Sequence, residues 1–373
     1  MKKLRIAQVS TPFITVPPKD YGGIELVVAN LTEGLVKKGH EVTLFAPGDS
    51  QTSAKLFAPF EKAVSMKAME KMFSPLAKKL FWLHSLPSLY HITAAFERAN
   101  EFDIIHNHLH YLGLFFGSLV KTPTVHTYHG DFSSAIKSPI ERMILEKYKD
   151  NFWTAISQSQ RENCPVKLNV SGVVYNSIWV DKFDWSKKAG DYLMWLGRIT
   201  PRKGLSQAIE VTKRLGRKLV IAGVVKPRDT DYFQKEIKPR IDNKMIVSVG
   251  AVDHSTKVRY LKNAFALLYP VTWQEPFGLV MVEAMACGTP VIAFKNGAVS
   301  EVVRDGVTGF IIDSKKGVEG LAKAVQTMQQ WNKETMRQCR LACRKHVEEN
   351  FSVQKMVKDY ENVYERILKS RKT

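Results

Sequence analysis

The segment from residue 191 to residue 223 reads DYLMWLGRITPRKGLSQAIEVTKRLGRKLVIAG, and it holds a complete strand–helix–strand pattern. Short apolar runs at 193–196 and 219–222, each followed by glycine, are typical of buried parallel strands. Between them lie a polar loop and a stretch long enough for the helix that connects two parallel strands. This segment alone therefore predicts an α/β fold with a parallel sheet.

The same alternation continues on both sides of this segment. Downstream the strand-like runs are MIVSVGAV, AFALLYP, PVIAF and GFIID, and upstream they are LRIAQVS, EVTLFA, DIIHNH, TPTVHTYHG and FWTAIS. Apolar residues recur at helical spacing from Ile24 to Lys38, and Gly39 can end that helix in a left-handed conformation. Two successive doubly wound units predict two Rossmann-like domains with a cleft between them.

The domain junction is expected in the polar stretch from Ser177 to Gly190, which gives domains of residues 1–180 and 181–351. Residues from about Trp331 to the end are expected to form two helices. The stretch KLFAPFEKAVSMKAMEKMFSPLAKKLFWLHSLP, residues 55–87, is also expected to be helical. It could contact lipid or acceptor as an amphipathic surface helix, or pack its apolar stripe on its own domain.

The length and composition of the chain are those of a folded protein that is large enough for two hydrophobic cores. The chain has 373 residues, of which 45% are hydrophobic and 24% charged. No apolar run reaches the roughly 18 residues of a membrane-spanning helix. The opening MKKLRIAQVS lacks the apolar stretch and cleavage site of a signal peptide, so we interpret it as a first strand and expect a cytoplasmic protein.

The cysteines have neither metal-type nor redox-type spacing, which favours reduced structural thiols; they are Cys164, Cys287, Cys339 and Cys343.

The chain is strongly basic, with 55 Lys and Arg against 36 Asp and Glu and a net charge of +19. Nucleic acid, anionic lipid or phosphorylated ligands could account for such an excess. No block of like charges and no alternation of basic and aromatic residues indicates a base-stacking surface, so we expect no nucleic-acid partner. One interpretation is a solvated basic face, with helix residues such as Arg337, Arg340, Arg344, Lys345, Lys355 and Lys358. Peripheral contact with the inner membrane face is the other.

Ligands of open α/β sheets bind beyond the carboxyl ends of the strands, and the first candidate residues follow two such ends. Gly22 and Gly23 come after LRIAQVS and just before a helix, where backbone can approach a phosphate, although a plain tight turn is also compatible. They are not the G-x-G-x-x-G fingerprint, which argues against NAD. Arg198 and Lys203 flank the loop after the strand at 193–196 and suit a diphosphate. Arg202 is interpreted as a surface charge.

A third candidate group lies in YPVTWQEPFGLVMVEAMACGTPV. Glu275 is placed in a loop, Phe277-Gly278-Leu279 opens a helix, and Glu283 lies within that helix. The N–H groups of the helix opening can hold an anion or a sugar hydroxyl. A carboxylate suits the vicinal hydroxyls of a ribose.

Histidines at strand ends form the fourth group: His106, His108, His110, His126 and His129. A zinc site would need a further acid or thiol at a fixed distance, so we expect no metal site. One or two of these histidines are expected to hydrogen-bond a ligand in the cleft, and the others to be buried for structural reasons.

With these motifs, the chain resembles the family 4 glycosyltransferases. The resemblance rests on GGIELVVANLTEGLVKKGHEVTLFAPGDS, FDIIHNHLHY, VHTYHGDF, WLGRITPRKG, EPFGLVMVEAMACGTPVIA and NGAVSEVVRDGVTGFII, which together span nearly the whole chain. It implies the GT-B fold, in which two Rossmann-like domains face each other. The first would bind the acceptor and the second the nucleotide sugar, and the C-terminal helix, about 352–373, would return to the first domain.

The resemblance also implies roles for individual residues. Arg198 and Lys203 would neutralise the diphosphate, Glu283 would bind the nucleotide ribose, and Glu275 would hold hydroxyls of the donor sugar. The backbone N–H groups of Phe277, Gly278 and Leu279 would also hold hydroxyls of the donor sugar. Gly22 and Gly23 would contact the phosphates, and His129 would contact the transferred sugar.

One motif departs from the family pattern. The usual asparagine-glycine turn followed by aspartate is replaced by Asn176-Ser177-Ile178-Trp179, although Asp181 and Phe183 stay in register. The departure falls at the domain junction and leaves the hinge geometry open.

The implied reaction is sugar transfer with retention and without a required metal or other cofactor. The donor would be a nucleotide-diphosphate sugar, with UDP favoured over GDP, and the acceptor a saccharide or small molecule, with lipid as an option. Attack on the face that the leaving phosphate vacates fits the lack of an obvious covalent nucleophile, and domain closure would exclude water. Three alternatives remain open. They are an inverting GT-B transferase with His106 or His129 as base, a sugar-nucleotide epimerase, and a basic nucleotide- or RNA-binding protein.

Overall fold

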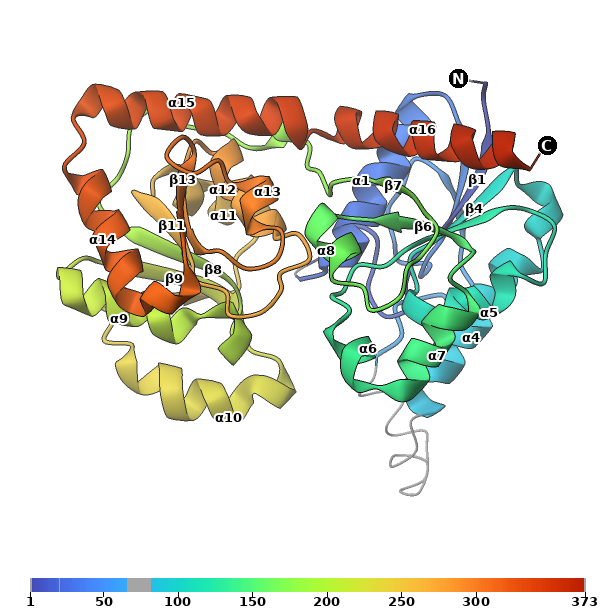
Figure 1. Ribbon diagram of the computed structural model, residues 1–373, viewed down its shortest axis with the longest axis horizontal. Helices are drawn as coiled ribbons and strands as arrows, with labels where there is room; N and C mark the ends of the chain where they lie inside the picture. Colours follow the sequence, from blue (N-terminus) through green and yellow to red (C-terminus); the bar gives the residue numbers. More distant parts are fainter. Residues whose placement is uncertain (1, 20, 66–81, 372–373) are drawn as a thin grey trace. The chain divides into compact units, whose positions relative to one another are not determined.

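The computed structural model describes residues 2–19, 21–65 and 82–371, which form two compact units (Figure 1). The N-terminal unit comprises residues 1–176 and 353–373, and the C-terminal unit comprises residues 177–352. Each unit has one parallel sheet with helices on both faces, as the fold class predicts. The middle of the expected helix at 55–87, residues 66–81, lies outside the described residues. Within the described ranges no helix is long and apolar enough to cross a membrane.

The sheet of the N-terminal unit has seven strands in the order β3-β2-β1-β4-β5-β6-β7. The strand order reverses between β1 and β4, so the loops after these two strands border the point where ligands bind in open sheets. The strands are β1 (Arg5–Val9), β2 (Glu41–Phe45), β3 (Lys55–Phe57), β4 (Ile104–Asn107), β5 (Thr124–Thr127), β6 (Phe152–Ala155) and β7 (Val170–Val173).

Helices cover both faces of this sheet. Alternation along β1 sends Ala7 and Val9 into a core with α4, while Gln8 points to the opposite face, where α16 packs. The helices are α1 (Gly23–Lys37), α4 (Trp82–Phe96), α5 (Leu114–Gly117), α6 (Ser133–Lys137), α7 (Pro139–Lys147), α8 (Gln158–Glu162) and α16 (Val353–Ser370).

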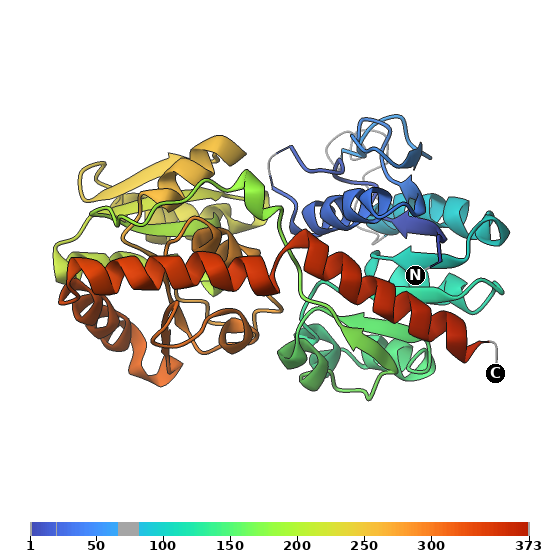
Figure 2. The same cartoon turned by 90° about the horizontal axis from the view of Figure 1, so that it is seen from above.

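The last helix of the chain, α16, belongs to the N-terminal unit, which confirms the expected return. It runs beside α1 (Figure 2) because α1 carries Gly34 at the crossing. A Cβ at Gly34 would lie 2.4 Å from Val357 Cγ2 and 2.9 Å from Val353 Cγ1. Glycine therefore allows the two helices to approach closely. Tyr360 and Tyr364 on the same helix are fully buried.

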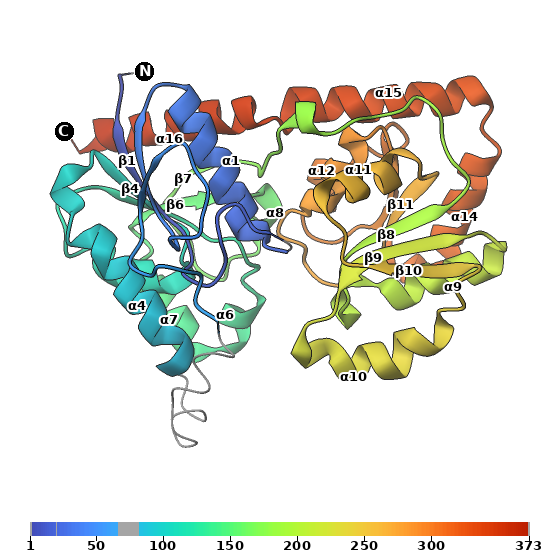
Figure 3. The same cartoon turned by 180° about the vertical axis from the view of Figure 1, so that it is seen from behind.

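The C-terminal unit has six parallel strands in the order β10-β9-β8-β11-β12-β13 (Figure 3), and its order reverses between β8 and β11. The strands are β8 (Leu193–Arg198), β9 (Leu219–Val224), β10 (Ile246–Gly250), β11 (Ala266–Tyr269), β12 (Val291–Phe294) and β13 (Gly309–Ile312). The helices are α9 (Leu205–Leu215), α10 (Thr230–Tyr232), α11 (His254–Lys262), α12 (Leu279–Ala286), α13 (Val299–Val302), α14 (Gly317–Gln329) and α15 (Lys333–Asn350).

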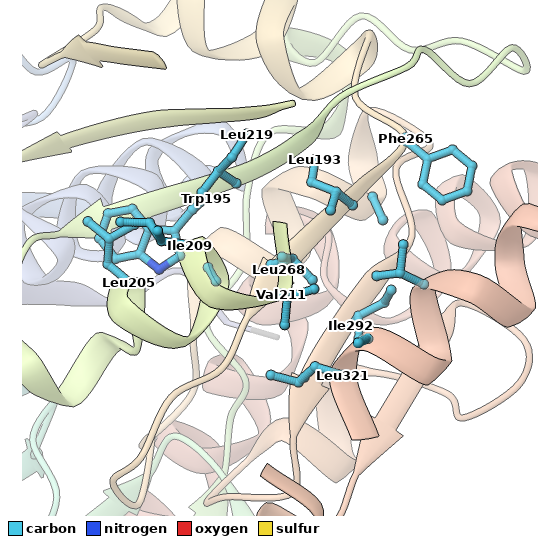
Figure 4. Close-up of a cluster of buried hydrophobic side chains, with 14 of the residues drawn as sticks. Leu193, Trp195, Leu205, Ile209, Val211, Leu219, Phe265, Leu268, Ile292 and Leu321 are labelled. Carbon is cyan, nitrogen blue, oxygen red and sulfur yellow. The ribbon is translucent and has the colours of Figure 1, made fainter. Parts of the chain in front are cut away.

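A large apolar core fixes the carboxyl ends of these strands. Trp195 and Leu268 of the sheet pack with Ile209 of α9 and Leu321 of α14 (Figure 4). Trp195 also donates a hydrogen bond from Nε1 to the carbonyl of Lys203, 3.1 Å away. The core thus positions the loop that follows β8.

The structure corrects two expectations from the sequence. Lys55–Phe57, expected to be helical, forms strand β3, which pairs with β2 at the edge of the sheet. Lys345, Lys355 and Lys358 are exposed as expected, but Arg340 and Arg344 are not part of a solvated face. Arg340 is fully buried and donates to the carbonyls of Ser186, Lys262 and Ala264. Arg344 is largely buried and donates to the carbonyls of Phe183 and Ala286. Both strands that the sequence failed to predict, β3 and β7, are edge strands of three and four residues.

Candidate active site

Two loops of the C-terminal unit meet at the point where its strand order reverses. Gly204, with φ +71°, sits after β8, and a Cβ there would lie 1.9 Å from the carbonyl oxygen of Pro270, after β11. The amide of Thr272 donates to the carbonyl of Arg202 at 3.0 Å. The loops that carry Lys203 and Glu275 are therefore held together by backbone contacts.

Glu275 is buried, and one of its carboxylate oxygens is surrounded by donors. Oε2 accepts from Lys203 Nζ at 2.5 Å, from Tyr269 Oη at 2.7 Å and from Trp273 Nε1 at 3.0 Å. Among the described residues, Oε1 receives none of these hydrogen bonds. Three donors hold this carboxylate in place through one oxygen, and the other oxygen can accept a hydrogen bond from a ligand hydroxyl.

The backbone around Glu275 is fixed by a second turn. The amide of Ala298 donates to the carbonyl of Glu275 at 2.8 Å, and a Cβ at Gly297 would lie 2.2 Å from that carbonyl oxygen. Gly278, with φ +88°, caps the N-terminus of α12, and Phe277 before it packs against Phe351 with ring centroids 5.8 Å apart. Phe277, Gly278 and Leu279 thus follow Glu275 directly into the first turn of the helix.

Glu283 lies on α12 and is paired with a residue that the sequence did not indicate. Its Oε1 accepts from Lys257 Nζ at 2.6 Å, and both side chains are largely buried. Lys257 comes from α11, and no motif marks it. Burial, with the Glu283 charge nearby, also raises the pKa of Cys287 to about 12, so this thiol stays protonated.

Arg198 lies at the carboxyl end of β8 next to Asp229, which follows β9. Arg198 Nε and Asp229 Oδ2 are 3.8 Å apart, too far for a hydrogen bond. Both atoms are buried and have no hydrogen-bond partner among the described residues. Arg228 Nε lies 3.7 Å from the same carboxylate oxygen. A buried guanidinium N–H without a partner is costly and is well suited to an anionic ligand.

In the N-terminal unit, Gly22 and Gly23 begin α1 but differ in their surroundings. A Cβ at Gly22 would lie 2.7 Å from Glu25 Oε2 and 2.8 Å from Pro18 Cβ, whereas a Cβ at Gly23 would meet nothing within 4 Å. Glu25 is buried and accepts from Thr11 Oγ1 at 2.6 Å. A carboxylate therefore already lies in the first turn of this helix.

The structure brings three of the five candidate histidines together and separates the other two. The ring centroids of His106 and His108 are 4.0 Å apart, and those of His108 and His129 are 5.2 Å apart. His126 instead lies against Trp153, and its Nδ1 is 3.2 Å from Asn107 Nδ2. His110 is exposed, with φ +34°, and its ring contacts Tyr128.

The three clustered histidines are held neutral. Burial, followed by the neighbouring imidazoles, lowers the pKa of His106 and of His108 well below the ordinary value. Burial lowers the pKa of His129 to about 3, although part of this side chain remains accessible to solvent. Within the described residues, no three His, Cys, Asp or Glu side chains are arranged to hold a metal ion.

Comparison with known proteins identifies the family. Residues 21–178 match the model described as Glycosyltransferase Family 4, and residues 177–346 match that of Glycosyl transferases group 1. The chain belongs to glycosyltransferase family 4. It is therefore a nucleotide-sugar-dependent glycosyltransferase of the GT-B fold, rather than a nucleotide- or RNA-binding protein without catalytic activity.

Individual relatives agree with this assignment over most of their length. The chain is 25% identical to the phosphatidyl-myo-inositol mannosyltransferase of Mycobacterium tuberculosis over 328 residues, which is 83% of this chain and 82% of the relative. Sucrose-phosphate synthase from Thermosynechococcus elongatus has a TM-score of 0.78 at 20% identity, with 99% of this chain and 100% of that one covered. HepE of Anabaena, in complex with UDP and glucose, has a TM-score of 0.72 at 17% identity, with 97% of this chain and 99% of that one covered.

Proposed function

We propose that this glycosyltransferase moves a sugar from a nucleotide diphosphate to an acceptor hydroxyl with retention of anomeric configuration and without a metal ion. The observation that carries the proposal is the placement of Arg198, Lys203 and Glu275. Arg198 ends β8, Lys203 lies in the loop after β8, and Glu275, which accepts a hydrogen bond from Lys203, lies in the loop after β11; the strand order of the C-terminal unit reverses between these two strands.

In this proposal Arg198 and Lys203 stabilise the leaving diphosphate. Negative charge grows on the phosphate as the bond to the sugar breaks, and fixed cations in a buried site stabilise that charge strongly. The unpartnered Nε of Arg198 would gain a hydrogen bond to a phosphate oxygen. These cations would supply the positive charge that a metal ion supplies in other transferases. Glu283 would bind the ribose, with Lys257 holding its carboxylate in place.

Glu275 would bind hydroxyls of the donor sugar rather than attack its anomeric carbon. Three hydrogen bonds to Oε2 make this carboxylate a weak nucleophile, because each stabilises the charge that an attack would use. We therefore propose attack by the acceptor on the face that the phosphate vacates, with the departing phosphate taking the acceptor proton. The amides of Phe277, Gly278 and Leu279 would bind the same donor, as would Gly22, Gly23 and His129 of the N-terminal unit.

An inverting reaction remains the alternative within the enzyme class, and it needs a general base. His106 is fully buried, and both of its ring nitrogens lie 2.7 Å from hydroxyl groups of the protein. Of the two histidines considered, His129 alone has an accessible side chain, so an inverting mechanism would depend on it.

A thermal-shift screen in EDTA tests the donor class. UDP, GDP, ADP and their sugars are compared; we expect UDP and UDP-sugars to give the largest shift, as the UDP complex of HepE suggests. Ligand at 100 times its Kd stabilises the folded state by about 2.7 kcal/mol. Absence of a shift with every nucleotide diphosphate would contradict the proposal.

The proposed acceptor is a saccharide or small molecule, and a lipid is a second candidate that one surface favours. Ile136, Ile140 and Met143 on α6 and α7 are more than 60% exposed, and Arg142 and Lys147 are exposed on the same helix pair. Large exposed apolar side chains next to basic ones are typical of surfaces that touch anionic membranes.

Vesicle flotation distinguishes the two candidates. Peripheral membrane contact predicts that the protein floats with anionic vesicles at low salt and that Ile140→Glu with Met143→Glu abolishes flotation. Val307→Glu, at an exposed apolar position of the C-terminal unit, is the matched control. If the unmodified protein does not float at low salt, the membrane candidate is wrong and the soluble acceptor stands.

A further inference from the structure

His129 is one end of a continuous chain of hydrogen bonds that passes through Tyr364 on the last helix of the protein. His129 Nε2 lies 2.9 Å from His108 Nδ1, and His108 Nε2 lies 2.9 Å from Gln8 Oε1. Gln8 Nε2 is 3.2 Å from Tyr364 Oη, which is in turn 2.7 Å from His106 Nδ1. All five residues belong to the N-terminal unit, and only His129 is partly accessible.

The direction of each hydrogen bond follows from the chemistry of the amide of Gln8. An amide oxygen can only accept, so His108 must carry its hydrogen on Nε2. A neutral imidazole has one N–H, which makes His108 Nδ1 an acceptor. His129 must then donate from Nε2, and its Nδ1 is left as an acceptor. With the amide oxygen of Gln8 facing His108, Nδ1 is the nitrogen of His129 that can accept a hydrogen bond from a ligand.

Tyr364 continues the hydrogen-bond chain on the other side of the Gln8 amide. Its oxygen accepts from Gln8 Nε2, and its hydrogen is directed to His106 Nδ1. His106 then donates from Nε2 to Thr127 Oγ1 at 2.7 Å. The reverse direction through the same atoms, with the amide of Gln8 turned over, would place the hydrogen of His129 on Nδ1 and make that atom a donor.

We propose that Gln8 and Tyr364 are positioning residues of the transfer reaction: they hold His129 neutral with its hydrogen on Nε2, so that Nδ1 accepts a hydrogen bond from a hydroxyl of the donor sugar. This inference rests on the proposed contact between His129 and that sugar. It assigns a role in the reaction to α16, the last helix of the chain. Neither residue touches the sugar in this account, because both act through His108.

The surroundings of the chain favour neutral imidazoles. The ionisable groups that lower the pKa of His108 are His106 and His129, and the one that lowers the pKa of His129 is His110; no carboxylate is among them. Gln8→Glu would place a carboxylate next to His108 Nε2, which favours a protonated imidazole and raises the pKa of the His108–His129 pair. The variant thus alters the property that the proposal concerns and keeps the size of the side chain.

The first test reads the hydrogen positions directly in the full-length protein. Histidines are labelled with ¹⁵N, and the signals of His129 are assigned by their loss in His129→Gln. Long-range ¹⁵N–¹H spectra show which ring nitrogen carries hydrogen. We expect Nε2–H at pH 7, and a hydrogen on Nδ1 of His129 would overturn the proposal. This measurement needs no variant of Gln8 or Tyr364 to fold.

The second test measures kcat/KM against pH for three variants. Tyr364→Phe keeps the ring and removes the hydroxyl, so we expect a mixture of His129 tautomers and a loss of about 5-fold in kcat/KM with unchanged affinity for free UDP. Gln8→Glu should move the acid limb of the profile to higher pH. Tyr360→Phe is the matched control: it removes a hydroxyl 3.3 Å from Thr127, outside the segment from Tyr364 to His129, and should change neither readout.

The outcomes separate this inference from the proposed function. If His129→Ala retains full kcat/KM, the proposed contact with the sugar is wrong, whatever its tautomer. If His129→Ala is impaired but Gln8→Glu leaves the acid limb in place, His129 touches the sugar and the positioning role of Gln8 and Tyr364 is wrong.

Discussion

Glu275 and Glu283 have different partners, and this difference predicts different phenotypes. Glu283 would contact the ribose, which free UDP and the donor share, so Glu283→Gln should weaken both about 10-fold. Glu275 would contact only the sugar, so Glu275→Gln should lower turnover about 100-fold and change the Kd for UDP less than about 3-fold. Titration calorimetry with UDP and initial rates measure the two effects. Equal losses of UDP affinity in both variants would refute this division of roles.

Arg198 ends β8 and Arg202 lies in the loop after it, and we expect substitution of only the first to lower kcat. Arg198 has a buried N–H without a partner, whereas Arg202 stacks on the ring of Trp273, 5.0 Å from its centroid. If Arg198 stabilises the leaving diphosphate, Arg198→Met should lower kcat about 10²-fold or more. Arg202→Met is the control and should retain kcat within about 3-fold. Similar rates for both variants would show that the charge of Arg198 is not used.

The candidate site residues that the sequence indicated belong to motifs, and the neighbours that the structure adds come from elsewhere in the chain. Arg198, Lys203, Glu275 and Glu283 share two short segments, and the structure places Lys203 and Glu275 in direct contact. Lys257 lies on another helix and resembles any surface lysine in sequence. Asp229, Gln8 and Tyr364 were missed for the same reason, because their roles depend on contacts between elements that are distant in the chain.

At the scale of elements, the alternation of apolar runs and helices predicted both parallel sheets. Buried central strands such as β8 carry continuous apolar runs, and this pattern is strong. Edge strands give a weak pattern: β3 has three residues within a stretch rich in Lys and Phe, and β7 has the sequence VSGV, with glycine and serine in place of apolar residues. The sequence also could not show to which face of the sheet each histidine points. That face depends on where each strand begins, and periodicity does not define the strand bounds to one residue.

The crossing of α1 and α16 predicts sensitivity to a single methyl group. Gly34→Ala would bring the new Cβ within 2.4 Å of Val357, so α16 must shift, at a cost of about 1–3 kcal/mol of stability. Gly23→Ala in the same helix has open space around it and should leave stability unchanged or slightly higher. Chemical denaturation compares the two variants, and equal stabilities would show that α16 does not pack on α1 as described.

At the scale of the whole molecule, five histidines of the N-terminal unit predict acid sensitivity. Burial lowers the pKa of His91 to about 4 and those of His126 and His129 to about 3, and it lowers those of His106 and His108 well below 6.5. Below pH 6.5 the unfolded chain binds protons that the folded unit excludes, so stability falls as the pH falls. Each histidine can contribute up to about 1.4 kcal/mol per pH unit.

Denaturation between pH 7.5 and 5 measures this effect, because ordinary carboxylates remain ionised in that range. The N-terminal unit should lose stability steeply from about pH 6.5 downward, while the C-terminal unit, which holds none of these five histidines, should change less. A stability that stays constant between pH 6.5 and 5 would show that these imidazoles are not buried as neutral groups.

The central claim is retaining, metal-independent transfer from a nucleotide-diphosphate sugar, and the anomeric configuration of the product tests it most directly. With the donor found in the thermal-shift screen, ¹H NMR follows the reaction in EDTA and reads the anomeric configuration of the glycoside that forms. We expect turnover in EDTA and an α-linked product from an α-linked donor. A β-linked product, or turnover that begins only after magnesium or manganese is added, would contradict it.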